Sequence, residues 1–270
     1  MLTRTLSMLG GLGRRAEARL WREGVFTWDD LEREAPRKLS ARQAARVQAD
    51  IATARQKLAE CDWGWFLKNI PAAARIRILP HVTPAYFDVE TTGLGCLDVI
   101  TTAALYSPNR PRLFVRQKNL DALPPCLSAT PFMITYCGTR FDLQFLRRDL
   151  KTDFEGEHLD LAPCLRAWGY RGGLKTCEHL LAVSRTETTG VDGAHAVRLW
   201  EDSCSGNRSA LDELLRYNLE DVLVLERIAV RLYNLSMERA MCFSPLPRPA
   251  QKESRTAAQQ QIQELCSLTI

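Results

Sequence analysis

The apolar residues of the chain follow one pattern in its middle and another in its second half. In the middle, short runs rich in Val, Ile, Leu, Phe and Tyr are separated by turns that contain Gly or Pro, which predicts β-strands. Three strands, around 86–90, 98–106 and 112–116, are expected to form an antiparallel meander. A fourth strand is predicted at 131–137, and a helix is predicted to follow it at 139–150.

After this helix the apolar residues recur at helical spacing. Short helices are predicted at 161–168, 175–183 and 195–203, and a long helix at about 210–237. Strands first, then a strand–helix unit and then helices predict an α/β domain with a mixed sheet flanked by helices. The tail from Pro245 is rich in Pro, Gln, Ser and Lys, so we expect it to be mobile.

The start of the chain predicts a small all-α region that is separate from the sheet. Ser40 and Gln43 have the spacing of a capping box, which is expected to open a helix that runs to about Cys61. We therefore divide the chain into a helical region at 1–79, an α/β domain at 80–240 and a flexible tail at 241–270.

The composition indicates a globular protein without a membrane span and without a disulfide framework. The chain has 270 residues, of which 46% are hydrophobic and 25% are charged, as in a globular protein. No apolar run approaches the roughly 20 residues of a membrane span, so no membrane partner is expected. The nine cysteines have neither CxxC nor zinc-site spacing, and no secretory signal precedes them, which favours reduced thiols and a cytoplasmic location.

The charges are distributed unevenly along the chain. Residues 1–87 carry 15 basic and 9 acidic side chains, whereas residues 88–236 carry 17 basic and 20 acidic ones. A basic front beside a slightly acidic middle fits a polyanion-binding arm next to a metal-binding core. The alternative is an ordinary solvated surface.

Two acidic residues lie on the first predicted strand, in the stretch Tyr86-Phe87-Asp88-Val89-Glu90. Strand side chains alternate between two faces, so Asp88 and Glu90 point the same way. Two carboxylates on one face of an apolar strand repel each other and lose hydration, so a fold that keeps them there usually needs a cation between them. The alternative is a solvated strand end whose acids face water.

Two further acids are candidates for the same site. Asp221 lies on the apolar stripe of the long helix, where a bare carboxylate is costly, and Tyr217 precedes it by one turn on the same side. Asp142 begins the helix after the fourth strand, where the helix dipole alone also favours a carboxylate. The opposite side of the long helix is expected to be solvated, and carries Glu213, Arg216, Glu220, Arg227 and Arg231.

Four carboxylates without a His or Cys ligand suit Mg²⁺ or Mn²⁺. Two such ions are a general device for phosphodiester cleavage, in which one activates the attacking water and the other stabilises the leaving oxygen. Nucleic acid is therefore the expected partner, and two divalent ions are the expected cofactors.

A glycine-rich turn near the N-terminus is a second candidate for contact with nucleic acid. Gly11 and Gly13 precede a helix that carries Arg14 and Arg15, and backbone N–H groups at such a turn can hold a phosphate. The pattern resembles the Gly-h-Gly turn of helix-hairpin-helix elements, which grip phosphates without reading sequence. A helical hairpin used only for packing and an organelle-targeting peptide are the alternatives.

Three segments together resemble the motifs of the four-acid (DEDD) 3′–5′ exonuclease superfamily, which has an RNase H-like fold. They are Asp88-x-Glu90-Thr-Thr-Gly-Leu, Phe141-Asp142 and Tyr217-Asn218-x-x-Asp221. One branch of this superfamily has His five positions before the last Asp, and the other has Tyr four positions before it. The chain has Arg216 and Tyr217 at these positions, so it resembles the Tyr branch.

More narrowly, the chain is similar to YprB-like RNase H-like proteins over most of residues 9–236. The shared features include His158-x-Asp160-Leu161 and Leu174-Lys175-x-Cys177-Glu178. The segment 118–130 departs from relatives of the proofreading type, which carry a fuller helix there.

The resemblance implies roles for individual residues. Asp88, Glu90, Asp142 and Asp221 would ligate the metals, and Glu90 with Tyr217 would orient the attacking water. Thr91, next to Glu90, would contact nucleic acid. For His158 a structural role is favoured over catalysis.

These observations predict a metal-dependent exonuclease that removes nucleotides from the 3′ end of single-stranded DNA or RNA. A nucleic-acid-binding protein that kept the fold but makes little use of the nuclease site is the main alternative. An acid-rich helical scaffold without nucleic acid is the third.

Overall fold

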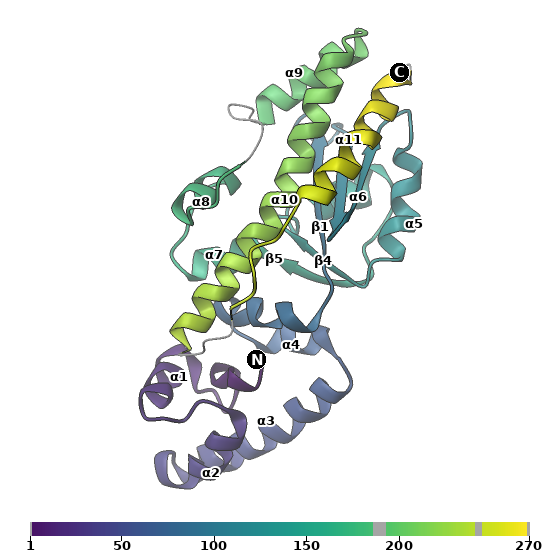
Figure 1. Cartoon of the computed structure of the whole chain (residues 1–270). Coiled ribbons are helices and arrows are strands. Elements are labelled where there is room, and N and C mark those ends of the chain that lie inside the picture. Colours follow the sequence, from purple (N-terminus) through teal and green to yellow (C-terminus); the bar gives the residue numbers. More distant parts are fainter. Residues whose placement is uncertain (1, 186–192, 241–244, 269–270) are drawn as a thin grey trace. The chain divides into compact units, whose positions relative to one another are not determined.

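A computed structural model gives the fold of the chain and describes residues 2–185, 193–240 and 245–268 (Figure 1). The chain divides into two compact units. The sheet unit comprises Thr83–Ala162, Tyr170–Ala229 and Arg248–Ile270. The helical unit comprises Met1–Val82, Pro163–Gly169 and Val230–Pro247.

The sheet unit contains a five-stranded mixed sheet with the strand order β3-β2-β1-β4-β5. The strands are β1 (Ala85–Thr91), β2 (Ile100–Ser107), β3 (Arg110–Val115), β4 (Phe132–Thr135) and β5 (Glu157–Asp160). The pairs β1–β2 and β2–β3 are antiparallel, which confirms the predicted meander. The pairs β1–β4 and β4–β5 are parallel, so β1 lies in the centre of the sheet.

The edge strand β5 is absent from the sequence-based prediction. Its four residues, Glu157-His158-Leu159-Asp160, contain one apolar side chain, so neither alternation nor an apolar run marks them. The strand forms because its backbone pairs with β4, with Met133 opposite His158 and Thr135 opposite Asp160.

The predicted helices after the fourth strand are present in the structure. They are α6 (Asp142–Asp149), α7 (Leu161–Ala167), α8 (Leu174–Leu180), α9 (Gly193–Cys204) and α10 (Arg208–Arg239). The segment 118–130, expected to be a connection, folds into the short helices η4 (Leu120–Ala122) and α5 (Leu123–Ser128). Leu123 and Leu127 of α5 are buried in the same core as Phe87 and Val89 of β1.

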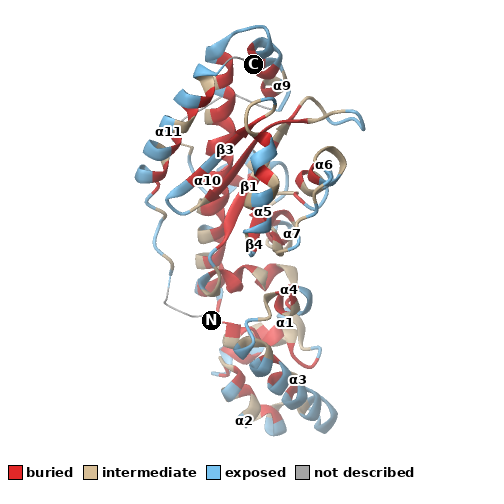
Figure 2. Ribbon diagram, turned by 90° about the vertical axis from the view of Figure 1, so that its right-hand side faces the viewer, coloured by how far each residue is buried: buried red, intermediate tan, exposed pale blue. Residues whose placement is uncertain are grey.

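The tail differs from the mobile segment that its composition predicts. Residues Lys252–Ser267 form helix α11, whose buried positions recur at spacings of three or four: Ser254, Ala258, Ile262 and Leu265. In Figure 2, α11 alternates between buried and exposed residues along its length. The Gln261 side chain contacts β3 through the N–H of Leu113 and the carbonyl oxygen of Pro111. The tail therefore forms a helix because a few buried residues recur at helical spacing, although its overall composition is polar.

Helix α11 also explains why one residue of α10 that was predicted to be exposed is buried. Glu220 was expected to face solvent but is 1% exposed. Its carboxylate accepts hydrogen bonds from Arg227 at 2.5 Å and from Arg255 of α11 at 2.6 Å. The inward stripe is as predicted, because Leu214, Tyr217 and Asp221 are all buried. Helix α10 is thus covered on more than one side, which a pattern read from one helix alone does not show.

The helical unit contains the predicted all-α region. Its helices are η1 (Leu2–Arg4), η2 (Leu6–Met8), α1 (Gly13–Arg22), α2 (Trp28–Lys38), α3 (Ala41–Ala59), α4 (Trp63–Asn69) and η3 (Ala72–His81). The Ser40 hydroxyl accepts the N–H of Gln43 as expected, but the complete capping box forms at Thr27 and Asp30. A buried ion pair joins Arg77 to Glu17 at 3.0 Å in this unit.

No helix in the described part of the chain combines the length and the apolar character that crossing a membrane would need.

Candidate metal centre

The central strand β1 presents the first two acids on one face. Asp88 and Glu90 are partly exposed, whereas Phe87, Val89 and Thr91 between and beside them are buried. The register with β2 shifts between Glu90 and Thr91, so the ladder is irregular immediately after the second acid. The alternation predicted from the sequence therefore places both carboxylates at the point where β1 leaves the regular sheet.

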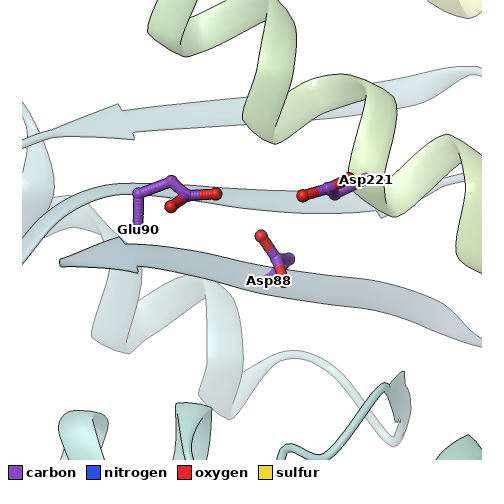
Figure 3. A group of neighbouring side chains, drawn as sticks. All are labelled: Asp88, Glu90 and Asp221. Atoms are coloured by element: carbon purple, nitrogen blue, oxygen red, sulfur yellow. The ribbon is translucent and has the colours of Figure 1, made fainter. Parts of the chain in front are cut away.

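Helix α10 brings a third carboxylate to the strand. One oxygen from each of Asp88, Glu90 and Asp221 lies within 4.8 Å of the others. Figure 3 shows the two strand side chains and the helix side chain pointing toward one another. Residues 88 and 221 are far apart in the sequence, so the fold builds this cluster.

Asp142 lies beside these three acids but has a different position. It is the first residue of α6 and is 2% exposed. Its Oδ1 accepts the backbone N–H of Val89 at 3.1 Å, which ties the start of α6 to β1 between the two strand acids. The group of oxygens within 4.8 Å consists of the other three acids.

The pKa of each of the four carboxylates is raised. Burial away from water is the largest cause for each. Repulsion from Asp221, Asp142 and Glu90 adds to the raised pKa of Asp88. Burial, with repulsion from neighbouring acids, raises the pKa of Asp142 to about 7, while burial raises that of Asp221 to about 6. The cluster therefore holds more negative charge than its surroundings stabilise, which is the condition that a bound cation relieves.

Asn218 orients the first acid, a role that our sequence analysis did not assign. Its side-chain N–H₂ donates to Asp88 Oδ2 at 2.8 Å and to the Asp88 carbonyl oxygen at 3.3 Å. Asn218 is fully buried and lies three residues before Asp221, hence on the same side of α10. This helical spacing was the signal that could have identified it.

Arg185 is a second residue whose role the sequence did not reveal. It forms hydrogen bonds at 2.8 and 2.6 Å with the two carboxylate oxygens of Glu178 and an ion pair at 2.5 Å with Asp221. Its guanidinium also lies 5.7 Å from the centre of the Tyr217 ring. Arg185 follows α8 in a non-helical segment, where no periodicity relates it to the acids.

Tyr217 is 6% exposed and is close enough to the acids to feel their charge. Burial raises the pKa of its hydroxyl, and the carboxylates of Asp221, Glu90 and Asp88 raise it further. The phenol is therefore neutral beside the cluster and can serve as a hydrogen-bond donor.

The loop after Glu90 is built by the remaining residues of the first motif. Asp98 accepts hydrogen bonds from the Thr92 hydroxyl at 2.8 Å and the Gly95 N–H at 2.5 Å. A Cβ on Gly93 would lie 2.7 Å from an Asp98 oxygen, so a larger residue here would displace the Asp98 side chain from its hydrogen bonds. The Thr91 hydroxyl donates to the Gly93 carbonyl oxygen at 2.7 Å. The loop thus uses the predicted nucleic-acid contact Thr91 for its own turn.

His158 and Asp160 support the turn that leads to Asp142. His158 Nε2 lies 2.9 Å from the Thr135 hydroxyl across the β4–β5 pair. Asp160 accepts the backbone N–H groups of Cys137 at 2.9 Å and Thr139 at 3.3 Å. These contacts agree with the structural role favoured for His158.

The N-terminal candidates lie in the helical unit. Gly11 and Gly13 have φ angles of +72° and +63°, and a Cβ on either would meet no atom within 4 Å. Arg14 donates a hydrogen bond to the Ala167 carbonyl oxygen at 2.8 Å, and Arg15 is exposed. The glycines are needed for backbone conformation, and phosphate binding by this turn stays a prediction.

The donor set fits a divalent metal ion with hard-ligand preference. Asp88, Glu90 and Asp221 offer only carboxylate oxygens, and Asp142 adds another nearby. Within the described part of the chain, no side chain or backbone group donates a hydrogen bond to the Glu90 carboxylate. Mg²⁺, Mn²⁺ and Ca²⁺ favour such all-oxygen sites.

Comparison with known proteins gives a family and two distant structures. The profile of the RNase_H superfamily matches residues 85–233, more than half of the chain, and confirms the predicted RNase H-like fold. No curated protein matches. The family B DNA polymerase of the hyperthermophilic archaeon Pyrobaculum calidifontis is 14% identical with a TM-score of 0.44 over 58% of this chain. The match spans only 27% of that polymerase. Brucella melitensis NrnC is 22% identical with a TM-score of 0.40, over 68% of this chain and 85% of its own.

Proposed function

The chain belongs to the RNase H superfamily, and on this premise we propose that it is a metal-dependent 3′–5′ exonuclease acting on single-stranded nucleic acid. The convergence of Asp88, Glu90 and Asp221 within 4.8 Å carries this proposal. Within the superfamily we assign the chain to the Tyr branch of the four-acid exonucleases, near the YprB-like proteins. Tyr217 precedes Asp221 by four residues, and Arg216 stands where the other branch has His.

Under this proposal the acids hold two divalent ions, Mg²⁺ or Mn²⁺. Asp88, Glu90 and Asp221 are the ligands that the geometry supports most directly, and Asp142 completes the set. When bound, such ions would provide an activated water and would neutralise charge on the cleaved phosphodiester. Asn218 keeps Asp88 in place through its two hydrogen bonds.

Glu90 and Tyr217 then position the attacking water. The Glu90 carboxylate is free to accept a proton or hydrogen bond from water, because no described group donates to it. The neutral Tyr217 hydroxyl donates on the same side. Together they fix the direction of attack, which is the main contribution that positioned side chains make to such a step.

A single-stranded substrate suits the loop that follows Glu90. Leu94 and Leu97 are 84% and 91% exposed, although large apolar side chains normally avoid water. An unpaired base offers an apolar face that a leucine can contact, whereas a base within a duplex is already stacked. This loop therefore favours the end of a single strand over a duplex.

The test uses DNA and RNA oligonucleotides of the same sequence with a fluorophore at the 5′ end. With Mn²⁺, the proposal predicts a ladder of labelled products that shortens one nucleotide at a time. A strand whose 3′ hydroxyl carries an inverted nucleotide should resist digestion. EDTA and the Asp88→Ala substitution should each abolish the ladder.

The same assay distinguishes an exonuclease from the main alternative, a nucleic-acid-binding protein that makes little use of its nuclease site. Tight binding of the labelled strand with no ladder in Mg²⁺ or Mn²⁺ would support a binding protein that makes little use of its nuclease site. Internal products from the blocked strand would show endonuclease activity and contradict the 3′–5′ assignment. Comparing the DNA and RNA strands gives the preferred sugar.

A further inference from the structure

Two basic side chains flank the aromatic ring of Tyr217 next to the acids. The Lys175 ammonium lies 5.3 Å from the ring centre, and the Arg185 guanidinium lies 5.7 Å from it. Both residues belong to the segment 174–185, which comprises α8 and the residues that follow it. Positive charge is thus placed beside an aromatic ring whose hydroxyl has its pKa raised by the carboxylates.

Arg185 is held rigidly in this position. Its side chain is 9% exposed, and Glu178, which is 6% exposed, binds it through two parallel hydrogen bonds. The ion pair with Asp221 fixes the guanidinium from a second direction. Its Nη1 is nevertheless buried with no hydrogen-bond partner in the described part of the chain. A buried guanidinium N–H without an acceptor is unfavourable, so an anionic oxygen that reached it would stabilise the site.

Lys175 adds a second, solvent-exposed positive charge near the buried guanidinium of Arg185. It is exposed, and the contacts of the described residues pair its ammonium with no carboxylate, although acids are close by. Its charge opposes the burial and the acid–acid repulsion that raise the pKa of Glu90. A lysine in this position can bind a further anion without first breaking an ion pair.

We propose that Lys175 and Arg185 form a phosphate-binding pair that positions the backbone of the substrate next to the metal centre. This inference rests on the proposed function, and it identifies the group of the substrate that these residues recognise. The Nη1 edge of Arg185 donates to a non-bridging phosphate oxygen, and Lys175 contributes a mobile charge. Glu178 is a positioning residue, because it acts only by holding Arg185. Backbone phosphates are common to DNA and RNA, so this pair does not select the sugar.

The simplest rival explanation is that both residues only offset the charge of the acids. In that case their removal would change metal binding and leave the affinity for the strand unaltered. A phosphate-binding role predicts the reverse for Lys175, whose ammonium forms no ion pair with a metal ligand among the described residues. The two explanations are therefore separated by KM and salt dependence rather than by loss of activity.

The experiment measures initial rates of digestion of a 5′-labelled strand in Mn²⁺ for wild type, Lys175→Gln, Arg185→Lys and Glu178→Gln. Lys252→Gln is the matched control, because it removes one exposed charge at the start of α11 in the same unit. Anisotropy of the labelled strand in Ca²⁺ gives binding without turnover. Thermal melting of each variant reports whether it is folded.

We expect Lys175→Gln to raise KM and the anisotropy Kd about tenfold, the effect of losing one charge-assisted contact. The slope of log affinity against log salt should fall by about 0.7, the value for one phosphate contact on a single strand. The Mn²⁺ concentration for half-maximal rate should change much less than KM, because Lys175 forms no ion pair with a metal ligand among the described residues. Arg185→Lys and Glu178→Gln should also raise KM, whereas Lys252→Gln should match wild type.

Two results would overturn the inference while leaving the proposed function standing. One is a wild-type KM and salt slope in Lys175→Gln and Arg185→Lys when wild type digests the strand. The other is a shift in the Mn²⁺ requirement of Lys175→Gln with no change in strand affinity, which would assign the lysine to charge balance. Failure of the wild-type protein to digest or bind any strand instead contradicts the proposed function.

Discussion

Replacement of Asp142 by Asn tests whether the acids repel one another in the metal-free protein. The change keeps the shape of the side chain, and the amide oxygen can still accept the Val89 N–H. It removes one negative charge from a buried cluster in which the pKa of Asp142 is raised from 3.8 to about 7. We therefore expect Asp142→Asn to stabilise the protein in EDTA at pH 8.

The magnitude follows from the pKa. A carboxyl whose pKa is higher in the folded state binds protons more tightly there, so stability falls as pH rises from about 4 to about 7. A shift of about three pH units corresponds to about 4 kcal/mol. Because protons taken up by the neighbouring acids already relieve part of this penalty, we expect about 2 kcal/mol. That is an increase in Tm of about 4–8 °C for a chain of this size.

The assay is thermal unfolding of wild type and Asp142→Asn in EDTA at pH 8 and at pH 4. The gain should be present at pH 8 and nearly absent at pH 4, where Asp142 of folded wild type is protonated and, like the amide of the variant, carries no charge. Asp121→Asn, an exposed acid without such neighbours, should give no gain at either pH. Saturating Mn²⁺ should reverse the order, because wild type gains about 2.7 kcal/mol at 100 times its Kd. A neutral or destabilising effect in EDTA at pH 8 would refute the reasoning.

Three further substitutions test separate parts of the site and the fold. Tyr217→Phe should lower kcat about 100-fold with little change in the Mn²⁺ requirement, because only a hydrogen-bond donor to water is lost; an unchanged kcat would remove the hydroxyl from the mechanism. Asn218→Leu should lower kcat at least tenfold by freeing Asp88, and it should raise the Mn²⁺ requirement; rates equal to wild type would show that Asp88 is held without it. Glu220→Gln should reduce the free energy of unfolding by about 2 kcal/mol in a urea titration, because Arg227 and Arg255 lose a buried partner, with KM unaltered.

The periodicity of apolar residues along strand β1 and helix α10 was enough to predict the positions of most residues of the candidate site. Alternation along β1 placed Asp88 and Glu90 on one face, and the apolar stripe of α10 placed Tyr217 and Asp221 inward, as the structure shows. Both arguments work because the residues on the buried face of a strand or helix recur at the spacing of that element, and this spacing can be read in the sequence.

What the sequence could not predict depends on contacts between elements. Glu220 belongs to the polar side of α10 by its spacing, and only the packing of α11 makes it buried. Arg185 lies outside any regular element, so no period relates it to Asp221. The edge strand with His158 has too few apolar residues to be recognised alone. In each case a partner far along the chain decides the environment.

The most direct test of the central claim is digestion of a 5′-labelled single strand by wild type and Asp88→Ala in Mn²⁺, with both proteins shown to be folded by thermal melting. The account predicts stepwise shortening from the 3′ end by wild type and none by the variant. Equal digestion by the two proteins, or no digestion by either, would contradict a nuclease centre built on Asp88, Glu90 and Asp221.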